Sequence, residues 1–421
     1  MYKININAVD DIVPTATSRP RNLSMSSTSS PKSKPKIKFA SNTPKLPALL
    51  NPSQSQASMR GANLSPCSPQ ATTSLSKTHG SDSVKKAYTP MFKVPKLLKA
   101  VCPLKSNGLV KSYAANTSIG IVRTYNEDRI SISYRIARPK NKLYDNWPTC
   151  SWFGLFDGHA GSQCADFLRD NLLHYVVNQD SFPSNPRSAI LDGFREAETC
   201  FLNYATSVPE KVERSGSCAV VVLIVGSTAY VANVGDSRAV LSMDRGLRFE
   251  NFTNDHKPND PNERARIYSH GGEVYFRTGS SFTSYATGEN SEYIVHRVLP
   301  GRLSVSRTFG DVDAKLAHLG GKPGVVIAEP EIRVYEIRDN YDFILMGCDG
   351  IFDKLSSSDA IETCWRAMTG EKSAGNFHAH CGTVVNALLT RSMNAVSTDN
   401  VTALIIAFKN LQNAYKGVPP S

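Results

Sequence analysis

The sequence predicts an α+β domain in which β-sheets pack against each other and α-helices cover the outside. Short β-branched and aromatic runs begin after about Asn107, and polar turns of two or three residues join several of them. Segments with helical periodicity lie in blocks between these runs. Strands and helices that do not alternate one by one favour antiparallel sheets over a parallel sheet of βαβ units. Because no second linker follows Asn107, one large domain fits better than two.

The expected strands share a short length, a high content of β-branched and aromatic residues, and turn residues at their ends. They are residues 119–122 (IGIV), 130–136 (ISISYRI), 152–156 (WFGLF), 217–225 (SCAVVVLIV), 228–234 (TAYVANV), 237–243 (SRAVLSM), 343–347 (FILMG) and 402–408 (TALIIAF). The turns at 225–228 and 235–237 are expected to join consecutive strands into antiparallel meanders.

Three segments are expected to form helices. They are residues 160–179, 189–205 and 357–368. In the first, Ala165, Leu168, Leu172 and Val176 recur at the spacing of one helix face. Serines that can cap a helix, followed by an acid in the first turn, open the third.

Residues 1–105 are expected to form a disordered, basic region rich in Ser, Pro and Lys, followed by a domain at 106–410 and a short tail at 411–421. The segment at 36–39 (KIKF) has the spacing of a strand-docking peptide, and several Ser-Pro or Thr-Pro steps suit proline-directed kinases. A kinase or docking partner could bind there, although a solvated basic linker explains both features more simply. The steps begin at Ser30, Thr43, Ser65, Ser68 and Thr89.

The positive charge of the chain lies in its first 100 residues, which hold fifteen Lys and Arg against three Asp and Glu. The whole chain has a formal net charge of +11, so the remaining residues together are close to neutral. A nucleic-acid-binding face would need basic residues clustered on the folded domain, so we expect no specific nucleic-acid site. Binding of polyanions or anionic membranes by the basic first 100 residues stays open as a secondary property. Neither aromatic residues between the basic ones nor the periodicity of an amphipathic helix supports it.

Nine scattered cysteines without a C-x-x-C motif indicate a reduced, intracellular protein and not a disulfide framework or zinc module. No apolar run approaches the ~18 residues of a membrane span. The N-terminus has no signal-peptide pattern, and Tyr2 stands where myristoylation requires glycine. The expected location is the cytoplasm or the nucleus, and the expected state is a monomer.

Carboxylates stand at the ends of several expected strands. Asp157 follows WFGLF, Asp349 follows FILMGC, and Asp399 precedes NVTALIIAF. Glu127 and Asp128 lie between two strand-like runs. Any one of them alone is ordinary turn chemistry, but a lone carboxylate beside a core costs several kcal/mol, and the pattern recurs. Convergent carboxylates without a Cys or His cluster indicate a hard divalent cation, Mg²⁺ or Mn²⁺.

Three further residues suit phosphoryl chemistry. Arg123 can bind a phosphate with its planar guanidinium, although an ion pair with a neighbouring acid would also explain it. His159, beside Asp157, is placed to donate a proton to a leaving alkoxide, although a lone histidine is often structural. Gly158 has no Cβ, so its carbonyl can approach an ion closely. Two metals would activate a water and clamp a phosphoryl group.

Nine motifs, in the family's order from about Ser106 to Phe408, make the chain resemble the metal-dependent Ser/Thr protein phosphatases of type 2C. Each motif alone is weak, but nine in sequence are specific. They are RTYNEDR (123–129), FDGHAG (156–161), GSCAVV (216–221), ANVGDSRAV (232–240), DHKPNDPNERARI (255–267), GRLSVSRTFGD (301–311), EPEI (329–332), CDGIFDKLS (348–356) and STDNVT (397–402).

The resemblance implies a sandwich of two antiparallel β-sheets flanked by helices, with a dimetal site at one end of the sandwich. It also implies hydrolysis of phosphoserine and phosphothreonine in phosphoprotein substrates by a dimetal-bound hydroxide. Asp157 would bridge the two Mg²⁺ or Mn²⁺ ions, and the Gly158 carbonyl would serve the first. Asp349 and Asp399 would hold the second.

The resemblance assigns the remaining site residues as well. Glu127 and Asp128 would contact metal directly or through water, Arg123 would bind phosphate, and His159 would be the general acid. Asp236 and Asp353 match positions used for a third, more weakly held metal. We expect Asp311 to be structural, holding Arg307 or a turn.

The departures from the family pattern are few. Cys218 replaces a common threonine, which should affect packing more than chemistry, and Phe352 replaces a frequent tryptophan. The flap segment at 275–298 is longer than usual, so transfer of substrate preference is weakest there. The alternative function is an inactive pseudophosphatase that acts as a binding or scaffold protein, and the complete set of acids argues against it.

Overall fold

The computed structural model of the 421-residue chain describes residues 4–6, 94–140, 142, 146–280, 292–370 and 376–419. The Ser-Pro and Thr-Pro steps, the KIKF segment and most of the region expected to be disordered lie outside these residues. Residues 281–291 of the flap segment lie outside them as well.

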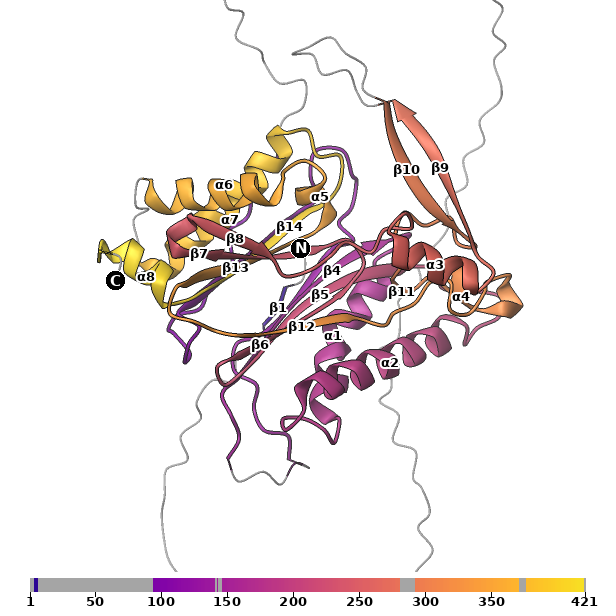
Figure 1. Ribbon diagram of the computed structural model, residues 1–421, viewed down its shortest axis with the longest axis horizontal. Helices are drawn as coiled ribbons and strands as arrows, with labels where there is room; N and C mark the ends of the chain where they lie inside the picture. Colours follow the sequence, from indigo (N-terminus) through magenta and orange to yellow (C-terminus); the bar gives the residue numbers. More distant parts are fainter. Residues whose placement is uncertain are drawn as a thin grey trace, which may run out of the picture. The chain divides into compact units, whose positions relative to one another are not determined.

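Two β-sheets form the centre of the domain, as the sequence predicts (Figure 1). The seven-stranded sheet has the order β1-β3-β4-β5-β6-β12, with β11 paired to β5, and all its pairs are antiparallel except β1 with β3. Its strands are β1 (Ile4–Ile6), β3 (Arg129–Ser133), β4 (Cys150–His159), β5 (Gly216–Val225), β6 (Thr228–Val234), β11 (Phe309–Gly310) and β12 (Glu331–Glu336). The five-stranded sheet has the order β2-β14-β13-β7-β8. Its strands are β2 (Ser112–Ser118), β7 (Arg238–Met243), β8 (Arg248–Asn251), β13 (Tyr341–Gly347) and β14 (Val401–Ala407).

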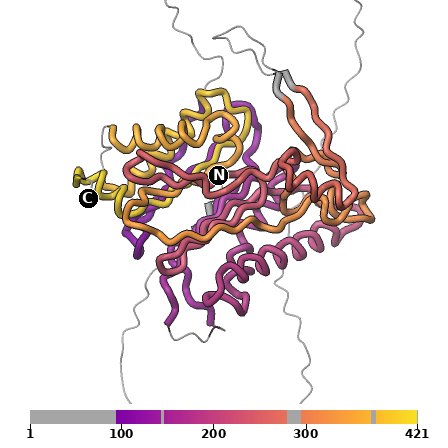
Figure 2. The backbone as a smooth tube through the Cα atoms, in the orientation of Figure 1, coloured from indigo at the N-terminus to yellow at the C-terminus, as the bar shows by residue number. Residues whose placement is uncertain are grey.

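Helices cover both outer faces of this sandwich (Figures 1 and 2). Helices α1 (Gln163–Asn178) and α2 (Pro186–Ala205) pack on the seven-stranded sheet. Helices α6 (Ser357–Thr369), α7 (Phe377–Asn394) and α8 (Lys409–Lys416) lie on the side of the five-stranded sheet. Short helices complete the chain, namely α3 (Pro261–Ser269), α4 (Val312–Lys315) and α5 (Asp349–Phe352). No helix among the described residues has the length and apolarity needed to cross a bilayer.

Successive side chains of β5 point to opposite faces of the sheet, so this strand contributes to two hydrophobic cores. Val220, Val222 and Ile224 face the core between the sheets, whereas Val221 and Leu223 face the core under α1 and α2. Successive side chains of a strand point to opposite faces, so a continuous apolar run is what a strand buried on both faces requires. The SCAVVVLIV run therefore marks the middle of the sandwich.

Two of the expected elements are wrong. Residues 119–122 are not a strand but the turn after β2, where a Cβ on Gly120 (φ +80°) would lie 2.1 Å from the carbonyl oxygen of Asp399. Residues 235–237 do not close a hairpin, because β6 belongs to the seven-stranded sheet and β7 to the five-stranded sheet. This short link therefore crosses from one sheet to the other.

Residues on both sides of the expected 106–410 domain pack against its core. Val94, Leu97 and Val101 do so before the domain, and Leu411 and Tyr415 in α8 do so after it. The packed unit therefore extends beyond 106–410. The flap segment forms a separate antiparallel pair, β9 (Glu273–Ser280) with β10 (Glu292–Leu299), which projects from the region of α3 and α4 (Figure 1).

Candidate dimetal site

The acids of the candidate site lie where strands of both sheets end. Asp157 is near the end of β4, and Asp349 opens α5 directly after β13. Asp128 immediately precedes β3, and Asp399 lies shortly before β14. Asp236 lies in the link that crosses between the sheets. Segments far apart in the sequence thus meet at one end of the sandwich.

Two overlapping groups of potential ligands share Asp157. Asp157, Asp236 and Asp349 each offer an atom within 4.8 Å of the other two, and so do Asp128, Asp157 and Cys348. Asp157 is common to both groups, as a ligand that bridges two ions would be. The structure thus brings together four of the expected ligands, Asp128, Asp157, Asp236 and Asp349, and it places the thiol of Cys348 beside them, a group that was not expected there.

The protein environment disfavours negative charge on these acids. Burial, followed by repulsion from Asp349 and its neighbours, raises the pKa of Asp157 well above its usual range. Burial and repulsion from Asp236 and other acids do the same to the pKa of Asp349. Burial raises the pKa of Asp128 to about 6, even though Thr402 Oγ1 donates a 2.6 Å hydrogen bond to it. A cation between these oxygens would remove both penalties, so the donor set fits Mg²⁺ or Mn²⁺.

Arg123 lies at the edge of the acidic cluster with a 44% exposed side chain. Its Nη2 donates to Asp399 Oδ2 at 2.6 Å, and its Nη1 lies 3.8 Å from Glu127 Oε2. Burial opposes the charge of Arg123, but the charge and hydrogen bond of Asp399 outweigh it, so the pKa of Arg123 rises. A guanidinium that is half exposed and oriented by acids is well placed to receive a phosphate.

Glu127 is tied to the turn after β4, because the backbone N–H of Gly161 donates to its Oε1 at 2.5 Å. Gly158 lies against the same residue, since a Cβ there would be 2.5 Å from the carbonyl oxygen of Glu127. Any other residue at this position would push β4 away from the segment before β3. The structure therefore brings Glu127 and Gly158 together.

His159 is held by Asp311, a residue expected to hold Arg307 or a turn. Its Nε2 lies 2.9 Å from Oδ2 of Asp311, whereas Arg307 pairs with Glu263. Burial opposes the charged imidazole, but the charge of Asp311 outweighs burial and raises the pKa of His159. Asp311 therefore holds His159 and not Arg307.

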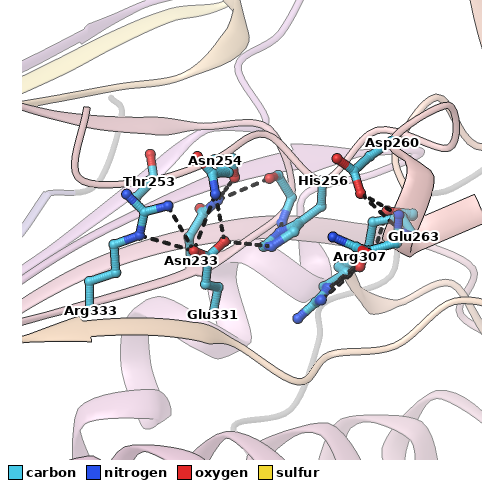
Figure 3. A network of polar contacts seen from close by, with 12 residues as sticks. Asn233, Thr253, Asn254, His256, Asp260, Glu263, Arg307, Glu331 and Arg333 are labelled. Carbon is cyan, nitrogen blue, oxygen red and sulfur yellow. Dashed lines mark hydrogen bonds and ion pairs between the residues drawn. The ribbon is translucent and has the colours of Figure 1, made fainter. Parts of the chain in front are cut away.

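A polar network fixes the link that carries Asp236 (Figure 3). The N–H of Gly235 donates to His256 Nδ1 at 3.1 Å, and the Gly235 carbonyl accepts from Asn233 Nδ2 at 3.0 Å. Since Nδ1 accepts, neutral His256 carries its proton on Nε2, which lies 3.5 Å from Glu331 Oε2. Both backbone groups of Gly235 are thus satisfied, and the position of Asp236 is set by its neighbours.

Asp236 and Asp353, the expected ligands of a third ion, already have a cation beside them. Lys257 Nζ forms an ion pair with Asp236. Burial raises the pKa of Asp353, and the charge of Lys257 partly offsets this effect. A cation that binds Asp236 would therefore have to compete with the ammonium group of Lys257.

Comparison with known families matches the part of the chain that carries the candidate site. The model of the protein phosphatase 2C family matches residues 124–401, more than half of the chain. The chain belongs to the protein phosphatase 2C family. Only Arg123 among the expected site residues lies outside the matched stretch, by one position.

Two relatives illustrate the similarity within the protein phosphatase 2C family. Protein phosphatase 1A of Oryctolagus cuniculus is 33% identical over 273 residues, which cover 62% of this chain and 63% of that protein. Protein phosphatase 2C homolog 2 of Hypocrea jecorina is 32% identical over 286 residues, which cover 67% of this chain and 59% of that protein. The chain thus spans less than two thirds of the length of these relatives.

Solved structures share the fold at lower identity. The serine-threonine phosphatase 2C from Toxoplasma gondii has a TM-score of 0.55 at 21% identity, covering 75% of this chain and 100% of that one. A sex determining protein of C. elegans has a TM-score of 0.57 at 21% identity, covering 73% of this chain and 67% of that one. These two likenesses concern the fold alone.

Asn400 is a site residue that the sequence reasoning missed. Its Nδ2 donates to the carbonyl oxygens of Ile119 and Tyr125 at 3.0 Å each, and its Oδ1 accepts from Glu127 N at 2.9 Å. One side chain thus fixes the segment that carries Arg123 and Glu127 against Asp399. The Asp-Asn pair within the STDNVT motif was the only available signal.

The two single-residue departures from the protein phosphatase 2C pattern are Cys218 and Phe352. Cys218 Sγ donates to Asp236 Oδ1 at 3.3 Å, and a Cβ on Gly235 would lie 2.3 Å from that sulfur. Cys218 therefore touches a candidate ligand as well as filling space. Phe352 is buried under the guanidinium carbon of Arg238, which lies 5.2 Å from its ring centroid.

Proposed function

We propose that this chain is a Mg²⁺- or Mn²⁺-dependent phosphatase that hydrolyses phosphoserine and phosphothreonine in proteins. The observation that carries the proposal is the convergence of buried acids from both sheets around Asp157, with Arg123 and His159 beside them. The names of relatives such as protein phosphatase 1A support the same reaction class.

The residues of this chain divide into ligands and groups that act on the substrate. Two ions would be held by Asp157, the Gly158 carbonyl, Asp349 and Asp399, together with Glu127 and Asp128. Asp236 and Asp353 would hold a weaker third. When bound, such ions supply Lewis-acid charge and a water of lowered pKa.

Arg123 orients the substrate. Its guanidinium has five N–H donors in a planar fork, and one of them bonds Asp399. The remaining donors can bind two phosphate oxygens at once, which fixes the phosphorus for attack from the side of the acids. Because Asp399 and Glu127 hold Arg123 before substrate arrives, little side-chain entropy is lost on binding.

His159 donates the proton that the leaving alkoxide needs. Asp311 raises its pKa, so the imidazole is charged over a wider pH range and has a proton to give. A serine or threonine alkoxide is a poor leaving group, and protonation removes the charge that would otherwise develop on its oxygen. Asp311 acts on the reaction only through His159, so it is a positioning residue.

A phosphopeptide assay of the full chain tests this function. We expect phosphate release with Mn²⁺ or Mg²⁺, loss of activity in EDTA, and recovery when the ion is restored. Activity that survives chelation would contradict the dependence on metal. Absence of phosphate release from phosphopeptides and aryl phosphates at millimolar Mn²⁺ would favour the inactive scaffold instead.

A further inference from the structure

The β9–β10 hairpin carries a cationic recess that the proposed hydrolysis does not use. Tyr275, Arg277, Arg297 and Arg302 line it, and its volume is about 290 Å³. We propose that this recess binds an oxyanion of the substrate, on a residue that flanks the scissile phosphoserine or phosphothreonine. The oxyanion is a second phosphate or a carboxylate, and the inference rests on the proposed phosphatase function.

Strand pairing explains why these side chains gather. Arg297 of β10 lies directly opposite Tyr275 of β9, and Arg277 is two residues further along β9. Side chains two apart on a strand share a face, so Tyr275, Arg277 and Arg297 all face the same side of the hairpin. The chain then turns back, and Arg297 Nη1 donates to the carbonyl oxygen of Arg302 at 2.6 Å.

The charge of the recess is not neutralised within the described part of the chain. No carboxylate among the described residues lies within ion-pair distance of Arg277, Arg297 or Arg302. The nearby Arg266 and Arg307, by contrast, both pair with Glu263. Guanidinium groups that share a recess repel one another, so an anion that binds there gains from all three. Phosphate and carboxylate fit the planar fork of arginine with two hydrogen bonds.

The base of the recess is attached to the segment that holds the proton donor. A Cβ on Gly301 would lie 2.6 Å from the Cβ of Ala314, so the turn before Arg302 packs tightly on α4. Helix α4 begins immediately after Asp311, the residue that holds His159. Val298 of β10 is buried in the same small core as Ala314. The base of the hairpin and the His159–Asp311 pair are therefore both attached to the short helix α4.

The backbone at Arg302 also favours a binding role. Its φ is +60°, in the left-handed region that a glycine or asparagine would occupy more easily. An arginine rarely adopts this backbone conformation, and residues held in such conformations are common at ligand-binding sites. The cationic recess thus brings together three guanidinium groups that have no carboxylate partner among the described residues, one of them on a residue with positive φ.

Matched phosphopeptides test the proposal. Each peptide carries one scissile phosphoserine and, at a scanned flanking position, phosphoserine, glutamate or alanine. The quantity measured is the ratio of kcat/KM for the anionic peptide to that for the alanine peptide. We expect a ratio of about tenfold for the flanking phosphoserine and less for glutamate, mainly through KM. In the double variant Arg277→Gln/Arg302→Gln the ratio should fall to about one.

Arg264→Gln is the matched control, because Arg264 is exposed on nearby α3 and stacks over Tyr268, as Arg277 does over Tyr275, but lies outside the recess. It should keep the wild-type ratio. A wild-type ratio near one at every position, or a ratio unchanged in the double variant, would overturn the proposal. If no peptide is hydrolysed, the proposed function has failed. Binding of the doubly phosphorylated peptide in EDTA, measured by fluorescence anisotropy, then still tests the recess. Binding that does not depend on Arg277 and Arg302 would then reject the recess.

Discussion

His159 and Asp311 are 152 residues apart in the sequence, yet Nε2 of the histidine lies 2.9 Å from one carboxylate oxygen of the aspartate and 3.0 Å from the other. Gly216 makes this contact possible. A Cβ at Gly216 would lie 2.0 Å from Asp311 Oδ2 and 2.4 Å from His159 Nε2. The glycine of the GSCAVV motif is therefore required by the His159–Asp311 pair and not only by the strand that contains it.

Replacing His159 with alanine should slow the hydrolysis of phosphopeptides much more than that of aryl phosphates. General acid catalysis contributes about 10²- to 10⁴-fold, and it matters most when the leaving group is a poor one. Asp311→Asn should show the same pattern with a smaller loss, because an amide cannot stabilise the charged imidazole. The measurement is kcat for both substrate types with each variant.

The aryl phosphate serves as the internal control for folding in that experiment. Equal losses on both substrates would remove His159 from the role of general acid.

Replacing Asp157 with asparagine should abolish turnover and, in EDTA, stabilise the fold. The pKa of Asp157 is raised because burial and neighbouring acids oppose its charge, so removing that charge relieves repulsion. We expect the free energy of unfolding in EDTA to rise by about 1 kcal/mol or more, measured by urea denaturation. Added Mn²⁺ should stabilise the wild type by about 2 to 4 kcal/mol at saturating excess, but the variant far less.

Asp192→Asn, on α2 where the side chain is 42% exposed, provides the comparison for a simple loss of negative charge. If both variants responded alike to Mn²⁺, Asp157 would not be a ligand.

Glu263 should make the fold sensitive to acid. Burial raises its pKa, but hydrogen bonds from Arg307 and Ser306 and the charge of Arg266 outweigh burial and lower the pKa from 4.5 to about 2 (Figure 3). A depressed pKa adds stability that is fully present above about pH 4.5 and is lost as the pH falls through about 2. The difference in unfolding free energy between wild type and Glu263→Gln should therefore shrink over that range.

Glu362→Gln is the matched control, because Glu362 pairs with Arg366 on the exposed surface of α6. Its difference from wild type should stay small at every pH. A Glu263 difference that did not change between neutral pH and pH 2 would show that the ion pairs around it add no stability.

Replacing Asn400 with alanine should lower both stability and activity. The substitution leaves the backbone groups of Ile119, Tyr125 and Glu127 without their partner, at a cost of about 2 to 4 kcal/mol. Since these groups fix the segment of Arg123, KM for phosphopeptides should rise as well. Asn171→Ala in α1, which removes one hydrogen bond within a helix, should change neither property substantially. A normal KM in Asn400→Ala would show that Arg123 is positioned without it.

Local patterns in the sequence predict seven of the fourteen strands of the described residues, and they place Asp157, Asp349 and Asp399 beside apolar strands. Partners from elsewhere in the chain are different. Asp311 is expected to hold Arg307 or a turn, but the fold brings Asp311 to His159, and Arg307 pairs with Glu263. Contacts between side chains that are distant in the sequence depend on how the strands are arranged in the fold. Local sequence patterns do not reveal this arrangement.

Helix α7 was missed for a related reason. Its sequence contains Gly382 and a run of β-branched residues, which are weak helix formers. Packing overrides this preference, since a Cβ at Gly382 would lie 3.1 Å from both Ala100 and Cys102. The glycine lets residues before β2 lie against the helix. Tertiary contacts, and not propensity, therefore make this segment helical.

The acids belong to different layers of the sandwich. Glu127, Asp128 and Asp157 adjoin strands of the seven-stranded sheet, whereas Asp349 and Asp399 adjoin strands of the five-stranded sheet. A slight shear of one layer over the other would separate the carboxylates before any strand lost its hydrogen bonds. The geometry of the proposed catalytic centre therefore depends on how the two sheets are aligned. We expect heat or denaturant to remove turnover before it unfolds the strands.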